Sequence, residues 1–234
     1  MPPEHRLSDA ALVQAAVFGK HPGHGDFLSA GLPDELEWRL SEWLGSSLGP
    51  VREQIGPAWP AVCQSRTALR FWLGAEIGHG MAWRGVMRMS CDKVGRNYPL
   101  LILSGAAPDS LPTLQVEQDF YIAAEEALAD LFEQAVLLPS ETQPLLAARL
   151  NGFEGAERGL GGHEHMFWAM RASGSAPDLL ADLALTDLIC GATSRSYWWF
   201  SHAEAGGTGV LSCQGLPDPQ ALSWLITGGA GPES

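Results

Sequence analysis

The sequence predicts an α/β protein in which a mixed, partly antiparallel sheet lies between two layers of helices. Short apolar segments of strand length alternate with longer segments whose apolar residues recur at helical spacing. Several neighbouring strand segments are joined by loops too short for a crossover helix, so those pairs must be antiparallel. Helices separate the remaining strands, and the expected architecture is a three-layer α-β-α sandwich.

Seven segments are expected to be strands. The clearest alternation places Arg84 and Arg88 on one face of the third strand. In the sixth strand, Trp198 and Trp199 point to opposite faces, which is typical of a central strand covered on both sides. The predicted strands are residues 12–18, 68–73, 82–89, 99–104, 165–170, 196–201 and 208–213.

Five segments are expected to be helices. Pro33 suits the first turn of one helix, and Gly49-Pro50 is expected to end it. Ser140 begins a Ser-Glu-Thr-Gln capping box and therefore another helix. Residues 151–162 hold five glycines and are expected to be a loop. The predicted helices are residues 33–48, 114–138, a segment after Ser140, 178–190 and 218–226.

Composition restricts the class of protein. The chain has 234 residues and no linker-like segment, so we expect one domain over residues 1–234. Its apolar runs are far shorter than the roughly 20 residues of a membrane span, and the N-terminus lacks the pattern of a signal peptide. Four scattered cysteines without CxxC spacing read as reduced packing residues. We therefore expect a cytoplasmic protein.

Charge is distributed unevenly. The net charge of −13 argues against nucleic acid and anionic membranes as partners, since both need clustered basic residues. Residues 1–100 hold 10 basic and 10 acidic residues, whereas residues 101–234 hold 4 and 17. We expect an acidic face on the helix at 114–138, made by Glu117, Asp119, Glu125, Glu126, Asp130 and Glu133.

The loop that follows the first strand is rich in glycine and chemically active residues. His21, His24 and Asp26 are potential metal ligands, in a loop position where α/β proteins often bind ligands. Their spacing matches no metal-binding signature. The alternative is structural: the glycines allow unusual dihedral angles, Asp26 accepts hydrogen bonds from amides of its own turn, and Phe27 anchors the loop to the core.

A second unusual segment joins the third and fourth strands. Asp92, Lys93 and Arg96 crowd into one turn, which suits an anion site or a peptide clamp. The structural alternative is a tight turn in which Asp92 caps amides, Gly95 adopts a positive φ and Arg96 pairs with a carboxylate elsewhere. We expect this segment to lie near the first loop at one end of the sheet, with Asp26 and Arg96 as candidate charge partners across the two loops.

No catalytic motif is recognisable. The sequence has no nucleophile elbow, no P-loop and no Gly-x-Gly-x-x-Gly turn, so it predicts no cofactor. His163 and His165 fit a solvated strand end better than a metal site, because no partner ligand has a fixed spacing to them.

Four motifs together resemble the TagF/ImpM family of type VI secretion-associated proteins. They are Gly-Lys-x-Pro-x-x-Gly-Asp-Phe at 19–27, Ser-x-Asp-x-Val-Gly-Arg-x-x-Pro-Leu at 90–100, Ser-x-Trp-Trp at 196–199 and Gly-Leu-Pro at 215–217. The motif residues are candidates for structural or partner-binding roles: Gly19, Lys20, Pro22, Gly25, Asp26, Phe27, Ser90, Asp92, Gly95, Arg96, Pro99, Ser196, Trp198 and Trp199.

The resemblance implies a function without catalysis. It implies a cytoplasmic α/β protein that represses type VI secretion after translation by binding the forkhead-associated scaffold protein of that system. The alternative from the residues alone is a metal-dependent hydrolase, or a small-ligand-binding enzyme, that uses His21, His24 and Asp26. The sequence leaves the oligomeric state and the partner-binding surface open.

Overall fold

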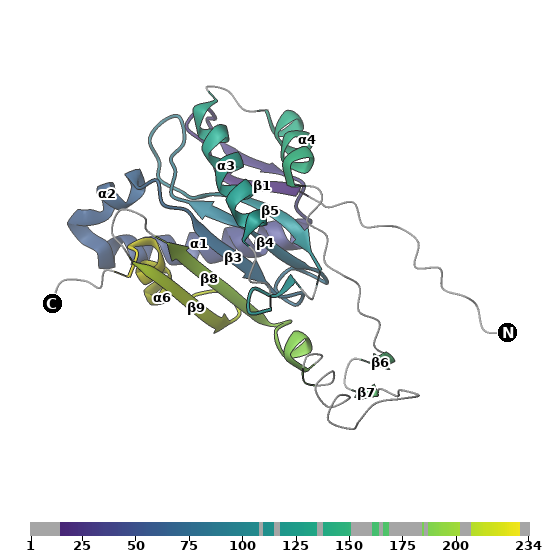
Figure 1. Cartoon of the computed structure of the whole chain (residues 1–234). Helices are drawn as coiled ribbons and strands as arrows, with labels where there is room; N and C mark the ends of the chain where they lie inside the picture. Colours follow the sequence, from purple (N-terminus) through teal and green to yellow (C-terminus); the bar gives the residue numbers. More distant parts are fainter. Residues whose placement is uncertain are drawn as a thin grey trace.

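A seven-stranded sheet forms the centre of the computed structural model (Figure 1). The structure describes residues 15–107, 110–114, 118–134, 138–150, 161–163, 166–168, 184, 187–201 and 207–229. The strands of the sheet are β1 (Ala15–Lys20), β2 (Phe27–Ala30), β3 (Leu69–Leu73), β4 (Ala82–Arg88), β5 (Leu100–Ala106), β8 (Arg195–Ser201) and β9 (Thr208–Gln214).

The sheet is antiparallel throughout. Its strand order is β2-β1-β5-β4-β3-β8-β9, and each neighbouring pair is antiparallel. The α/β class is confirmed, but the expectation of a mixed sheet is wrong. A helical connection makes a parallel pair only when the strands it joins become neighbours. Here β2 and β3, and likewise β5 and β8, are separated by other strands.

Helices cover both faces of the sheet, as the three-layer prediction requires (Figure 1). α1 (Asp34–Ile55) and α6 (Pro219–Ile226) pack on one face, and α3 (Asp119–Glu133) and α4 (Pro139–Leu150) pack on the other. A 3-10 turn (Gly56–Ala58) and α2 (Trp59–Gln64) follow α1. None of the described helices is both long enough and apolar enough to cross a membrane.

Alternation along the strands builds a separate core under each helix layer. Trp83 and Trp198 pack under α1 and α6. Val86 and Ile102 pack under α3 and α4, together with Phe120 of α3. Successive side chains of a strand point to opposite faces. Strands with apolar residues at nearly every position therefore contribute buried side chains to both cores.

The first helix is longer than predicted. α1 continues through Pro50 to Ile55, although an internal proline removes one backbone hydrogen bond. Val51 is fully buried and Ile55 packs against the same core, so burial of a further apolar turn outweighs the lost bond.

Other boundaries also differ from the prediction. α3 is shorter than the predicted 114–138, because Leu114 and Leu138 continue the apolar spacing but are exposed and outside the helix. β2 and α2, of four and six residues, were missed because segments so short show little periodicity. β7 (Met166–Trp168) lies within the strand predicted at 165–170, whereas β6 (Gly161–His163), which pairs with it antiparallel, includes two residues of the predicted loop.

Some predictions fall outside the described residues. They include the start of the first strand at 12–14, the loop at 151–160 and most of the helix at 178–190, of which residues 184 and 187–190 are described and helical.

Candidate functional site

The two long motif loops lie against each other at one end of the sheet, as the sequence predicts. β1 pairs with β5, so the loop that leaves β1 meets the loop that enters β5. The amide of Lys20 donates to the carbonyl of Pro99 (3.2 Å), and the amide of Lys93 donates to the carbonyl of His24 (3.1 Å). We call residues 21–27 and 89–99 the paired loops.

A buried carboxylate ties the paired loops together. The side chain of Asp92 is fully buried and receives the Lys20 ammonium (Nζ to Oδ2, 3.0 Å) and the Arg96 guanidinium (Nε to Oδ2, 2.6 Å). Its other oxygen accepts from the amides of Val94 (3.0 Å) and Arg96 (2.9 Å). Asp92 therefore caps its own turn, as the structural reading expects, and also binds the end of β1.

The protonation state of Asp92 follows from these contacts. Burial alone would raise the pKa of this carboxyl, but hydrogen bonds from Arg96, Lys20 and Val94 outweigh it and hold the pKa well below its usual range. The group is ionised, its acceptors are engaged, and it acts as a structural anchor.

The expected pairing of Asp26 with Arg96 is replaced by a different one. Arg96 reaches across the loops only to the carbonyl of Gly25 (3.4 Å), and its charge partner is Asp92. Asp26 is exposed and accepts from the amide of Phe27 (2.8 Å), so it caps its own turn as predicted. The ion pair that crosses the loops joins Lys20 to Asp92, which are 72 residues apart in the sequence.

Gly19 makes the close approach of the loops possible, and Gly95 allows the second loop to turn. Gly19 has φ +129°, and a methyl group there would overlap the carbonyl oxygen of Pro99. Gly95 has φ +85°, as predicted for the turn around Asp92. Ser90 is buried, and its carbonyl accepts from the amide of Tyr98 (3.0 Å).

His21 fixes the first loop to the layer of α3. It is fully buried; Nδ1 accepts from the amide of Gly23 (3.0 Å), so the ring proton lies on Nε2, 2.8 Å from the carbonyl oxygen of Leu131. Burial lowers the pKa of His21, although the bond to Leu131 opposes this, and the ring is neutral.

This geometry works against the metal-binding alternative. Coordination by His21 would require breaking one of its two hydrogen bonds within a buried site, while Asp26 is exposed and engaged in its own turn. Among the residues that the structure describes, no group of three His, Cys, Asp or Glu side chains is placed to hold a metal ion.

Aromatic rings support the base of the paired loops. Phe27 stacks on Phe18 (ring centroids 6.2 Å apart) and meets Tyr98 edge-on (4.9 Å), while the Lys20 ammonium lies 5.2 Å from the Phe27 ring centre. Phe27 thus anchors the loop as predicted, yet 42% of it remains exposed.

The third motif lies elsewhere and belongs to the core. Trp198 packs between Trp43 and Phe71, and Ser196 accepts from its indole nitrogen (2.9 Å). Trp199, on the opposite face as predicted, packs edge-on against Tyr121. Ser196 pairs with Leu73 at the end of the sheet away from the paired loops, so the motifs do not form one site.

A cavity of about 360 Å³ opens beside the paired loops. Pro22, Ser90 and Asn97 line it from the paired loops. Arg66 lines it from the segment between α2 and β3, and Arg88 lines it from the end of β4. Sequence analysis missed this site. The sequence signal was the presence of Arg84 and Arg88 on one face of a largely apolar strand, and nothing indicated that Arg66 lies beside Arg88.

Comparisons with known proteins agree with the motifs. A family model described as the TagF N-terminal domain, type VI secretion system-associated, matches residues 16–147, more than half of the chain. A crystal structure of PA0076 from Pseudomonas aeruginosa PAO1 has the same fold, with a TM-score of 0.69 and 21% sequence identity. The alignment covers 91% of this chain and 93% of that one. No curated protein sequence matches the chain significantly. The chain therefore belongs to the family of type VI secretion-associated proteins defined by the TagF N-terminal domain.

Proposed function

We propose that the chain is a non-catalytic cytoplasmic regulator that represses type VI secretion after translation by binding the forkhead-associated scaffold protein of that system. The family connects the chain to type VI secretion. The repressor role and the scaffold partner are what the motif resemblance implies.

One observation carries the choice of binding over catalysis: the reactive side chains of the motifs are engaged in holding the loops. Asp92 accepts from Lys20, Arg96 and two amides, and both ring nitrogens of His21 have protein partners. A general base or nucleophile must be free to meet a substrate. These groups instead build a rigid support, which a binding surface needs because preorganisation lowers the entropy cost of association.

The paired loops present a partly apolar surface to solvent. Its exposed residues include Phe27, Val94 and Arg96; Val94 is 73% exposed and stands at the tip of its turn. Aromatic residues and arginine are enriched at protein interfaces, and a few central side chains carry most of the binding energy. We propose that the paired loops are the surface that contacts the scaffold protein.

Two exposed valines provide a matched test. Val94→Asp places a charge at the tip of the paired loops, and Val210→Asp places the same charge on β9, where Val210 is 66% exposed. Calorimetry with the purified scaffold protein measures the dissociation constant of each variant. We expect Val94→Asp to weaken binding by about tenfold or more, as loss of an interface residue at a hot spot does, and Val210→Asp to bind like the unmodified chain.

Two results would refute parts of this proposal separately. If the unmodified chain does not bind the scaffold protein, the proposed partner is wrong. If it binds and Val94→Asp binds equally well, the paired loops are not the interface.

A further inference from the structure

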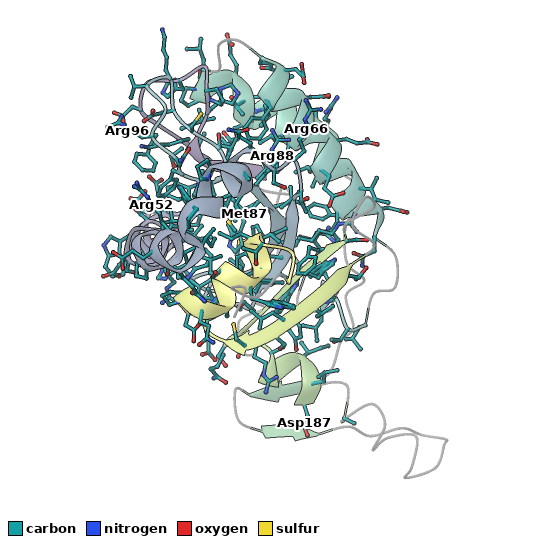
Figure 2. All side chains as sticks on the ribbon, turned by 90° about the vertical axis from the view of Figure 1, so that its left-hand side faces the viewer. Arg52, Arg66, Met87, Arg88, Arg96 and Asp187 are labelled. Atoms are coloured by element: carbon teal, nitrogen blue, oxygen red, sulfur yellow. The ribbon has the colours of Figure 1, made fainter. Side chains whose placement is uncertain are left out.

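The cavity beside the paired loops has the size and charge of a ligand site. Its volume of about 360 Å³ falls in the range of small-molecule pockets. Two arginines line it, in a chain whose net charge is −13. Figure 2 shows Arg66 and Arg88 close together, with Arg52, on α1, farther away.

Arg88 is held in a fixed orientation by an aromatic ring. Its guanidinium carbon lies 3.5 Å from the ring centre of Phe132. A guanidinium stacked on a ring uses its face, whereas its N–H donors point outward in its plane. The stacking therefore leaves the donor edge of Arg88 available to a ligand in the cavity.

The two guanidinium groups bring two positive charges to the cavity. In the described part of the chain neither Arg66 nor Arg88 forms an ion pair, and the exposed Glu133 favours the charged form of Arg88 from a greater distance than an ion pair. Burial lowers the pKa of Arg88, and Arg66 lowers it further. Both guanidinium groups stay charged, so an anion between them would relieve repulsion and replace lost hydration.

The other residues that line the cavity indicate which chemical group is attached to the anion. Ser65, Ser90 and Asn97 add polar groups, whereas Pro22, Pro60 and Met89 offer apolar contacts. The cavity is much larger than a single phosphate ion, which fills only part of such a volume. Paired arginines match the geometry of phosphate oxygens, and the apolar lining suits an organic group attached to them.

We propose that this cavity binds a small phosphorylated organic molecule, with Arg66 and Arg88 holding the phosphoryl group. The site stands on its own observations and does not depend on the proposed scaffold partner. Because residues of both paired loops line the cavity, a bound ligand would also reduce the motion of the paired loops.

Phenyl phosphate is a suitable probe, because it joins a phosphate monoester to a compact apolar ring. Calorimetric titration of the full chain is expected to show saturable 1:1 binding. Inorganic phosphate should bind more weakly because it lacks the ring, and phenol should not bind because it lacks the charge. Arg66→Gln and Arg88→Gln should each weaken phenyl phosphate binding by about tenfold or more, the effect of losing a charge-assisted hydrogen bond.

Arg195→Gln is the matched control, since Arg195 is exposed and begins β8 at the opposite end of the sheet. It should leave the affinity unchanged. If Arg88→Gln fails to fold, Arg66→Gln decides, because Arg66 is exposed. The proposal is overturned if millimolar phenyl phosphate does not bind, if Arg66→Gln binds it as tightly as the unmodified chain, or if inorganic phosphate binds equally well.

Discussion

At the scale of single residues, Gly19 leaves no room for a side chain beside the Pro99 carbonyl. Gly19→Ala should lower the free energy of unfolding by more than about 2 kcal/mol, because the new methyl group meets the Pro99 carbonyl at an unfavourable φ. Gly25→Ala is the control in the same loop, since nothing lies within 4 Å of its added Cβ. Urea denaturation measures both, and similar midpoints for the two variants would contradict the close approach.

His21 predicts a pH dependence of stability. Its folded pKa is below the ordinary value of 6.5, so the unfolded chain binds the proton more readily. The stabilisation from the neutral ring is complete above pH 6.5 and is lost as the pH falls from there toward the folded pKa. The urea midpoint should drop between pH 7.5 and 5.5, and the drop should be smaller in His21→Gln. An equal drop in the variant would assign the effect to other groups.

The site was only partly predictable from its residues. The turn around Asp92 and the cap at Asp26 follow from local rules for short polar side chains. The ion pair between Lys20 and Asp92 depends on β1 lying next to β5, and local sequence patterns do not contain that strand order. Local sequence patterns also do not predict that Arg66 and Arg88 line the same cavity.

At the scale of elements, a substitution of Pro50 tests whether burial of the last turn of α1 outweighs the hydrogen bond that this proline removes. Pro50 is exposed inside the helix, where proline removes a hydrogen bond to the preceding turn. Pro50→Ala should therefore raise the free energy of unfolding by about 2 kcal/mol. Pro219→Ala is the control, because Pro219 is the first residue of α6 and costs the helix nothing. A Pro50→Ala variant no more stable than Pro219→Ala would contradict this explanation.

Elements were predictable where periodicity and burial agree. The strands with two buried faces, such as β4 and β8, stand out in the sequence, and so does the helical stripe of α1 up to Leu48. The errors lie where tertiary packing overrides local preference, as at Pro50, and where apolar spacing continues into exposed residues, as at Leu114. The all-antiparallel sheet was missed for a related reason: local patterns identify strands but not their neighbours.

At the scale of the whole molecule, charge should influence association. The acidic surface of α3 is less uniform than the sequence suggests, because Glu125 binds Arg70 and Asp130 binds Arg149, and Glu117 lies outside the described residues. Glu126 and Glu133 remain exposed on this helix. We expect association with the scaffold protein to slow as salt rises, since electrostatic steering acts mainly on the association rate.

Charge reversal on α3 tests whether its acidic residues raise the rate of association with the scaffold protein. The double variant Glu126→Lys, Glu133→Lys should associate several-fold more slowly at low salt in stopped-flow measurements. Glu53→Lys, an exposed reversal on α1 in the opposite layer, should change the rate much less. A rate that is the same at low and physiological salt would leave the acidic helix with a role in solubility only.

We propose above all that this chain restrains type VI secretion by contacting the scaffold protein through its paired loops. The most direct measurement compares secretion into the medium by cells that lack the chain and carry back the unmodified form, Val94→Asp or Val210→Asp at equal protein levels. We expect secretion to rise when the chain is absent, to fall again with the unmodified form and with Val210→Asp, and to stay high with Val94→Asp. Secretion that does not change when the chain is removed, or that Val94→Asp represses fully, would contradict the account.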